Sequence, residues 1–182
     1  YLRARLEFLQ SVNYIKGHKL TPKGNFAAKI SAYELHVTEL FFGQYLHGLS
    51  PAEIAVLITA VVFESKRKVK YRRLKDKKMK NIKKDCTKTL KRLIKTESKL
   101  NIDPPLKNPD FKLSTVTWEW MTGSEFVDVL NATQAGAGDI IRSFRLSIQV
   151  MNMLNQAIEG HTEISENIET AIKTMKRDIV KA

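Results

Sequence analysis

The chain has 182 residues, of which 43% are hydrophobic, and its formal net charge is +12. This length suits one compact domain, or one domain with a piece of another, and the apolar content is enough for a sizeable core. No apolar run reaches the roughly 18 residues of a membrane span and no signal peptide is visible, so we expect no membrane partner. Cys86 is the single cysteine, which excludes an internal disulfide and favours a reducing, cytoplasmic location.

Residues 1–24 combine a short helical pattern with a turn. Leu2, Leu6 and Leu9 recur at helical spacing, and two short extended stretches then flank residues 16–18, which predicts a β-hairpin. We assign 1–24 to the C-terminal part of a winged-helix domain, because such domains end in a helix and a small hairpin. An ordinary helix and hairpin of the main domain is the alternative. The chain starts inside an amphipathic pattern and without Met, so we expect it to be an excised piece of a longer protein.

Residues 25–182 show helical periodicity almost throughout. The expected fold class is therefore all-α, a multi-helix bundle with a small β-hairpin near the N-terminus. Capping boxes at Ser50–Glu53 and Thr122–Glu125 predict two of the helix starts. The helix after Ser50 is apolar nearly all round and should lie at the centre of the bundle. Helices are expected from Pro22, over 34–46, over 51–64, from about Asn81, and over 123–132, 139–158 and 163–180.

Residues 66–99 contain 17 of the 31 Lys and Arg but 3 of the 19 Asp and Glu, so this segment carries a charge of +14 and the rest of the chain −2. The first part, 66–80, is too charged to pack well and should be a loop or an exposed helical extension. Beyond it, apolar residues share one helix face and lysines the other. A block of this kind favours a polyanion through phosphate contacts, although a solvated lysine-rich helix is the alternative. The candidate contacts are Lys83, Lys84, Lys88, Lys91 and Lys95.

The predicted helix 139–158 carries a second kind of polar face. Arg142, Arg145, Gln149 and Asn152 fall at i, i+3, i+7 and i+10, a stripe without acids or lysines. Guanidinium and amide groups donate to phosphates and hydrogen-bond or stack on bases, so we predict nucleic-acid contacts at these four residues. An ordinary solvent face is the alternative, but such a face usually mixes Glu and Lys.

Patterns of catalysis are missing from the sequence. There is no P-loop, no DExH box and no H-E-x-x-H zinc motif, and nothing suggests a catalytic triad. We therefore expect no catalytic residue, no metal ligand and no cofactor site in this chain.

Three blocks of sequence resemble one family in the family's own order. The first contains Trp120, Gly123, Phe126 and Gly138, followed by the run Ile140-Ile141-Arg142. The second comprises L-T-P-K-G-N-F-A and T-E-L-F-F-G-Q-Y-L-H-G-L-S-P-A-E-I, and the third is the closing R-D-I-V. These blocks resemble the DSHCT domain, the C-terminal helical domain of superkiller-type DExH RNA helicases.

The resemblance implies an accessory domain that packs on two RecA-like motor domains and helps to form a channel for single-stranded RNA. ATP and Mg would bind in the motor domains, and an RNA-degrading complex would be a further partner. The family's helix that matches 139–158 lines the RNA channel. This chain has Leu146 and Gln149 where the family has an Arg and a Glu that reach the nucleic acid, which leaves Arg142, Arg145 and Gln149 as candidates. Two alternatives stay open: a stand-alone helix-turn-helix or winged-helix DNA-binding protein, and a helical protein-interaction module.

Overall fold

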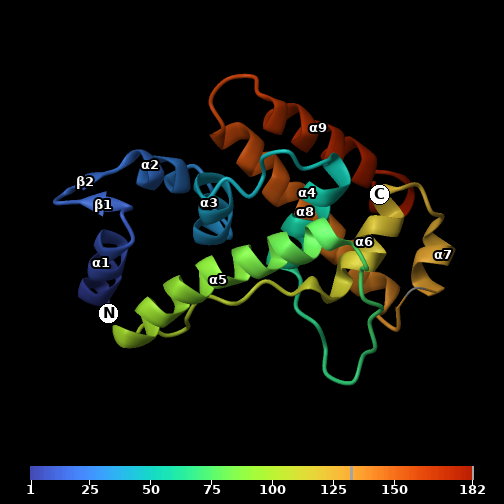
Figure 1. Ribbon diagram of the computed structural model, residues 1–182, viewed down its shortest axis with the longest axis horizontal. Helices are drawn as coiled ribbons and strands as arrows, with labels where there is room; N and C mark the ends of the chain where they lie inside the picture. Colours follow the sequence, from blue (N-terminus) through green and yellow to red (C-terminus); the bar gives the residue numbers. More distant parts are fainter. Residues whose placement is uncertain (132, 182) are drawn as a thin grey trace.

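The computed structural model describes residues 1–131 and 133–181 (Figure 1). Helices make up most of it, and its one named sheet is a two-stranded hairpin, so the expected all-α class with a small hairpin is confirmed. The elements are α1 (Leu2–Ser11), β1 (Ile15–Lys16), β2 (Lys19–Leu20), α2 (Pro22–Ala28), α3 (Glu34–Phe42), α4 (Pro51–Val62), α5 (Lys77–Lys99), the 3₁₀ turn η1 (Phe111–Leu113), α6 (Ser114–Met121), α7 (Phe126–Asn131), α8 (Ala137–Ala157), α9 (Glu163–Met175) and the 3₁₀ turn η2 (Asp178–Val180).

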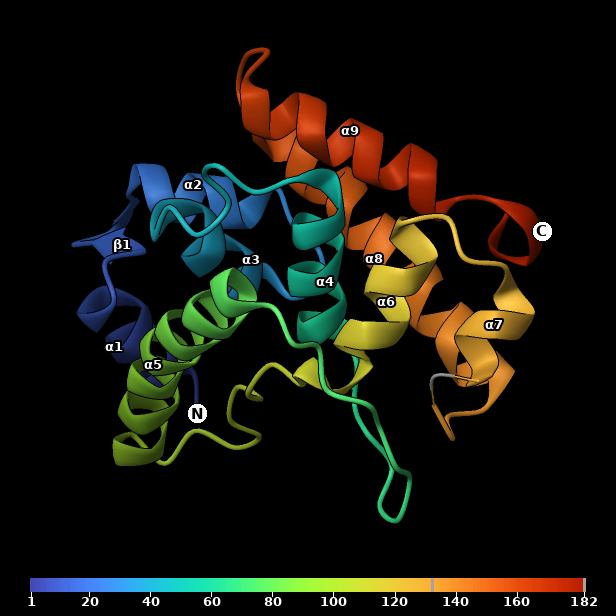
Figure 2. The same ribbon diagram turned by 45° about the vertical axis from the view of Figure 1, so that its right-hand side comes forward.

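Helix α4 forms the centre of the bundle, as its apolar sequence predicts. Its first turn is closed by the predicted capping box, in which the Ser50 side chain accepts from the Glu53 backbone and the Glu53 carboxylate accepts from the Ser50 N–H at 2.7 Å. Every residue of α4 from Glu53 onward is buried, and α6, α8 and α9 pack around it. Helix α5 passes in front of α4 in Figure 1 and α8 passes behind it, whereas in the turned view of Figure 2 α5 lies to the left of α4 and α8 behind it and to the right. The two long polar helices therefore lie on opposite sides of α4.

Trp120 joins α6 to α8 and to the C-terminal segment. The side chain is fully buried, and its ring stacks on Phe144 with centroids 6.0 Å apart. Its indole N–H donates to the Met175 carbonyl at 3.0 Å. The guanidinium of Arg177 lies over the Trp120 ring, 3.6 Å from its centroid, and donates to the Trp120 carbonyl at 2.8 Å. A single side chain thus fixes three segments that are distant in sequence.

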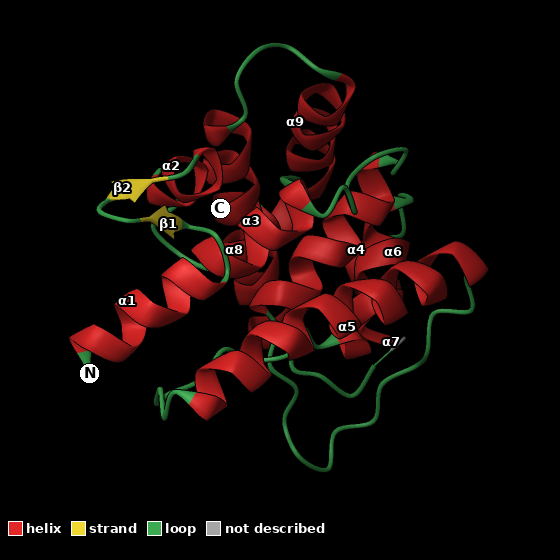
Figure 3. Cartoon of the chain, turned by 60° about the vertical axis from the view of Figure 1, so that its left-hand side comes forward, coloured by secondary structure: helices red, strands yellow, loops and turns green. Residues whose placement is uncertain are grey.

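The N-terminal helix and hairpin form a small unit at one end of the molecule (Figure 3). In the hairpin Ile15 pairs with Leu20 and Lys16 with Lys19, which confirms the predicted hairpin. Phe8 is buried in a small core that includes Leu93, near the end of α5. The assignment of residues 1–24 to a winged-helix domain stays a prediction.

Several predicted boundaries of the helices need correction. The helix expected over 34–46 ends at Phe42, because Gly43 takes the C-cap position and the chain then turns through Gln44 in the left-handed region. The helix expected from about residue 81 begins at Lys77, where the Asp76 side chain caps it by accepting from the Met79 N–H at 2.7 Å. The preceding residues form a loop, which was one of the two expectations for this charged stretch.

The capping box predicted at Thr122–Glu125 is wrong. Helix α7 begins at Phe126 instead of Gly123, and the Thr122 hydroxyl donates backward, to the carbonyl of Trp118 at 2.9 Å. The helix expected over 163–180 ends at Met175, and a separate 3₁₀ turn follows. The expected helix 139–158 runs from Ala137 to Ala157. Two residues inside the predicted ranges, Ala132 and Ala182, lie outside the described residues.

Candidate nucleic-acid interface

Helix α8 presents the predicted polar stripe to solvent. Arg142, Gln149 and Asn152 are exposed, while Phe144 and Met151 on the opposite face are fully buried. The Arg142 side chain has no hydrogen bond or ion pair with any residue in 1–131 or 133–181. Its five N–H donors are therefore available to an anion.

Arg145 lies in the same stripe but in a different setting. Its Nε donates to the Val180 carbonyl and its Nη2 to the Ile179 carbonyl, both at 3.3 Å. The guanidinium thereby holds the C-terminal turn η2 against α8. A contact with nucleic acid would have to share this group with the backbone of residues 179–180, and such a contact at Arg145 stays a prediction.

Helix α5 presents lysines on one side and a buried apolar stripe on the other. The five predicted residues, Lys83, Lys84, Lys88, Lys91 and Lys95, are all exposed. None of them forms an ion pair with a residue that the structure describes. On the other side Cys86, Leu90 and Leu93 are buried, and burial raises the pKa of the Cys86 thiol to about 12.

The acids of this segment are largely occupied elsewhere. Glu97 is fully buried, where its carboxylate accepts from Arg5 at 3.0 Å and from the Leu106 N–H at 2.6 Å. Asp76 caps the helix that follows it. The positive charge on the outer face of α5 is therefore poorly compensated within the chain, and an external polyanion would be attracted to it.

The two predicted sets of residues are not brought together. The lysines of α5 and the stripe of α8 belong to helices on opposite sides of α4 (Figures 1 and 2). They cannot form one compact binding site, so each has to be considered as a separate surface.

Residues 66–75, called here the 66–75 loop, connect these two regions, a link that the sequence analysis missed. Lys66 forms an ion pair with Asp139 in the first turn of α8, with Nζ and Oδ2 2.6 Å apart. Further along, the Gln134 N–H donates to the Lys70 carbonyl at 3.2 Å, and Tyr71 forms an isolated antiparallel bridge with Thr133. The alternation of Val69, Tyr71 and the surrounding cations was a weak signal for an extended, half-buried segment.

Neither a metal site nor a membrane-spanning helix is found in the part of the chain that the structure describes. Among the described residues, no group of three or more His, Cys, Asp and Glu side chains could hold a metal ion. In the same part of the chain, no helix has both the length and the apolar character needed to cross a bilayer. His36 is buried, with Nε2 2.7 Å from the Lys107 carbonyl, and burial lowers its pKa.

The fold and surfaces define a class of protein: a helical bundle with one lysine-rich helix and one helix that exposes an acid-free polar stripe, on opposite sides of a common core. Comparison with known families adds a direct match, since residues 17–182 fit the model of the DSHCT (NUC185) domain. The chain belongs to the DSHCT domain family, which confirms the resemblance seen in the sequence.

Similar proteins come from fungi and animals. The chain is 27% identical over 164 residues to the ATP-dependent RNA helicase mtr4 of Schizosaccharomyces pombe, covering 87% of this chain and 15% of that protein. It is 30% identical over 167 residues to the exosome RNA helicase MTR4 of Homo sapiens, covering 88% and 16%. It is 25% identical over 190 residues to the antiviral helicase SKI2 of Saccharomyces cerevisiae, covering 98% and 15%. The chain thus spans less than one fifth of the length of these relatives.

Proposed function

We propose that this chain is the C-terminal accessory domain of an ATP-dependent RNA helicase, with no motor of its own. Two findings support the proposal: its membership of the DSHCT family over residues 17–182, and its similarity to proteins that are named as helicases. In such a protein the domain packs on two RecA-like motor domains, where ATP and Mg bind. An RNA-degrading complex is a further proposed partner, in line with the exosome in the name of one relative.

The exposed stripe of α8 is the observation that carries the role in RNA guidance. Arg142 offers a planar, permanently charged fork that can bind a phosphate through two hydrogen bonds. Gln149 and Asn152 are exposed further along the same face, and each amide has both donors and acceptors for base edges. Together they line a path for single-stranded RNA, along which the motor domains would move the strand.

The mechanism in this domain is passive. Each contact is weak and polar, so a strand can exchange one contact for the next without a large barrier. Acids are missing from the stripe, so no side chain in it repels the phosphates. The domain would supply orientation and retention, and the motor domains would supply the free energy of movement.

The helix-turn-helix alternative fits the geometry less well. Its first helix would be α7, which has six residues. Its second would be α8, which buries one face along its length against α4 and α9. A preference for duplex DNA would restore this alternative, and a lack of nucleic-acid binding even at low salt would favour the protein-interaction module.

Arg142→Ala tests the proposal in a titration with fluorescent single-stranded RNA. We expect the variant to lose about 1–3 kcal/mol of binding free energy, with its fold intact, because one charged fork is removed from the path. Arg3→Ala is the matched control, since Arg3 is an exposed arginine on α1, and it should leave the affinity unchanged. Unchanged binding by an Arg142→Ala/Gln149→Ala double variant would contradict the assignment of α8.

A further inference from the structure

A hollow of about 1040 Å³ lies between the 66–75 loop, the start of α5 and the connector before α6. Half-buried apolar side chains form part of its lining, among them Tyr71, Leu74 and Phe111. Its volume is that of a small-molecule site, and sites of this type combine an apolar lining with a few polar groups. Six cations also line it: Arg72, Arg73, Lys75, Lys80, Lys83 and Lys112.

The hollow is electrostatically positive because six cations but a single acid are found among its described lining residues. Asp110 is the one acid among the described lining residues, and its two carboxylate oxygens accept from the Ser65 N–H at 2.9 Å and from the Lys112 N–H at 3.0 Å. Arg72 pairs with Glu119 outside the hollow. The other five cations form no ion pair with any described residue, so the positive charge of the lining exceeds the single negative charge of Asp110.

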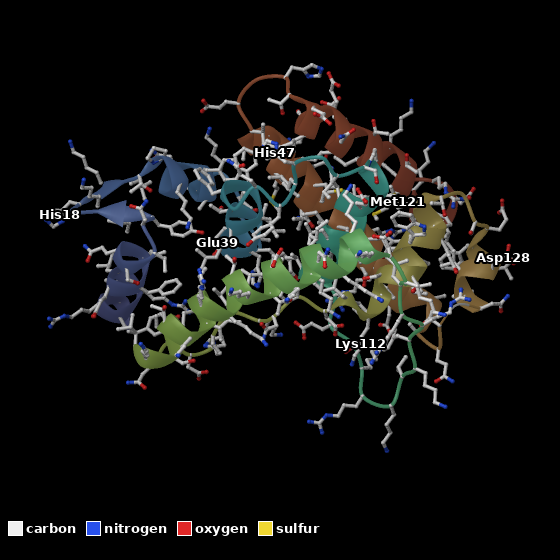
Figure 4. All side chains as sticks on the ribbon, in the orientation of Figure 1. His18, Glu39, His47, Lys112, Met121 and Asp128 are labelled. Atoms are coloured by element: carbon white, nitrogen blue, oxygen red, sulfur yellow. The ribbon has the colours of Figure 1, made fainter. Side chains whose placement is uncertain are left out.

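The aromatic rings of the hollow lie next to cations. The Lys83 ammonium is 5.4 Å from the centroid of the Phe111 ring, and the Lys112 ammonium is 6.0 Å from that of Tyr71. Figure 4 shows Lys112 at the base of the 66–75 loop, from which further side chains extend into solvent. A base that entered beside these rings would place its own phosphate within reach of an ammonium group. Stacking surfaces inside a positive groove are typical of sites that bind single-stranded nucleic acid.

The hollow continues into the lysine face of α5. Lys80 and Lys83 line both the hollow and a shallow groove that follows the outer side of the helix. From there the cations recur every three or four residues, which corresponds to steps of about 4.5–6 Å along the helix axis. This series, called here the α5 lysine track, consists of Lys80, Lys84, Lys88, Lys91 and Lys95.

The composition of the α5 lysine track favours nucleic acid over protein. Between Lys77 and Lys99 every exposed side chain is polar or charged. The centres of protein–protein interfaces are depleted in lysine and enriched in aromatic anchors, which the outer side of α5 lacks. A row of ammonium groups instead matches a repeating phosphate backbone, whose binding releases counterions.

We infer that the hollow and the α5 lysine track form a second RNA-binding surface, separate from the α8 stripe. A base enters the hollow beside Tyr71 and Phe111, and the phosphates of the same strand follow the lysines of α5. The inference rests on the proposed function for the identity of the polymer. The strand segment bound there differs from the segment that contacts α8, because α8 lies on the other side of α4.

The first test reverses charge on the track. The triple variant Lys84→Glu/Lys88→Glu/Lys91→Glu is compared with Lys16→Glu/Lys19→Glu/Lys173→Glu, which changes the net charge equally at exposed lysines elsewhere. Binding of a fluorescent ten-nucleotide oligouridylate by the whole chain is measured at several salt concentrations. We expect the track variant to lose at least tenfold in affinity, and its log–log salt slope to fall by about 2, as the loss of three phosphate contacts predicts. Equal losses in the two variants, or no binding by the unmodified chain at low salt, would overturn the inference.

The second test separates bases from phosphates. An RNA of the same length with abasic sites throughout keeps every phosphate, so the track alone would bind it as well as normal RNA. We expect it to bind at least fivefold more weakly, because the hollow loses the stacked base. Equal binding of the two RNAs would refute base entry. Polyglutamate of equal charge is tested as a competitor. If it displaces the bound RNA as effectively as unlabelled RNA does, the ligand is an acidic protein and the inference is overturned.

The two proposals fail in distinguishable ways. If the α8 variants weaken binding and the track variant behaves as its control, the proposed function stands and the second surface is refuted. If the track variant weakens binding and Arg142→Ala does not, the second surface stands and the channel assignment to α8 is refuted.

Discussion

Helices α5 and α8 are both long and amphipathic, and both expose a polar face with few acids, yet the two faces differ in chemistry. The exposed groups of α5 are mainly ammonium ions on flexible stems. Those of α8 are guanidinium and amide groups, and one of them, Arg145, is held by the backbone of the C-terminal turn. Ammonium groups act as mobile point charges, whereas guanidinium and amide groups have fixed hydrogen-bonding directions.

If both faces bind RNA as proposed, the difference explains how one small domain would contact a polymer in two ways. A lysine face holds phosphates at any register and is sensitive to salt. A face of directed donors holds a strand in a defined orientation and is less dependent on net charge. The first suits capture and the second suits guidance. The core between them, built around α4, sets their relative placement.

The largest expected effect on stability comes from a substitution in the core that packs against α8. Trp120→Ala should cost about 3–5 kcal/mol of unfolding free energy, because it removes a fully buried ring that contacts α8 and the C-terminal segment. Urea denaturation measures this cost. Trp118→Ala is the control, since Trp118 is half-buried, and its loss should be clearly smaller. A cost for Trp120→Ala below that of Trp118→Ala would contradict the assigned role of Trp120.

A milder change sharpens the contrast in chemistry. If α5 acts through charge alone, Lys88→Arg/Lys91→Arg should bind single-stranded RNA within about twofold of the unmodified chain. If α8 acts through a directed fork, Arg142→Lys should lose about 1 kcal/mol, although the charge is kept. Titration with the same RNA measures both. Equal effects of the two exchanges would mean that the faces do not differ in mode of recognition.

The smallest expected effect concerns residues 100–110, the connector between α5 and η1. His36 contacts the Lys107 carbonyl in that connector, and burial lowers its pKa below the ordinary value of 6.5. The unfolded chain therefore binds the proton more readily, so the stabilising contribution of neutral His36 is complete above about pH 6.5 and declines as the pH falls toward the lowered pKa. Thermal unfolding at pH 7.5 and pH 5.5 measures the decline. A His36→Asn variant should show a shallower decline, and an identical decline would exclude His36 as its source.

Much of the fold was predictable from local patterns, and the exceptions have physical reasons. The two predicted capping boxes share the same residue pattern, yet only the one at Ser50 exists. There Pro51 presets a helical φ at the first position. At Thr122 the next residue is Gly123, whose φ of 102° is incompatible with a helix. Gly123, inside the predicted capping box, therefore indicated from the sequence that no helix begins there.

The candidate site was predictable in residue type but not in arrangement. The periodicity of α5 and α8 correctly placed every candidate on an exposed helix face. It could not reveal that Arg145 contacts residues 179–180, or that Lys66 reaches Asp139, because both contacts join segments far apart in sequence. The hollow was missed for the same reason, since its lining comes from the 66–75 loop, α5 and the connector before α6.

The position of α4 also has a consequence for synthesis of the chain. Its buried surface is covered by α6, α8 and α9, all of which follow it in sequence. While the ribosome is still translating the lysine-rich segment, this largely apolar helix has none of those partners and must remain exposed or sheltered by other factors. The core can close only after α9 has emerged, so a ribosome that stalls anywhere before Glu163 leaves a nascent chain with its most hydrophobic element uncovered.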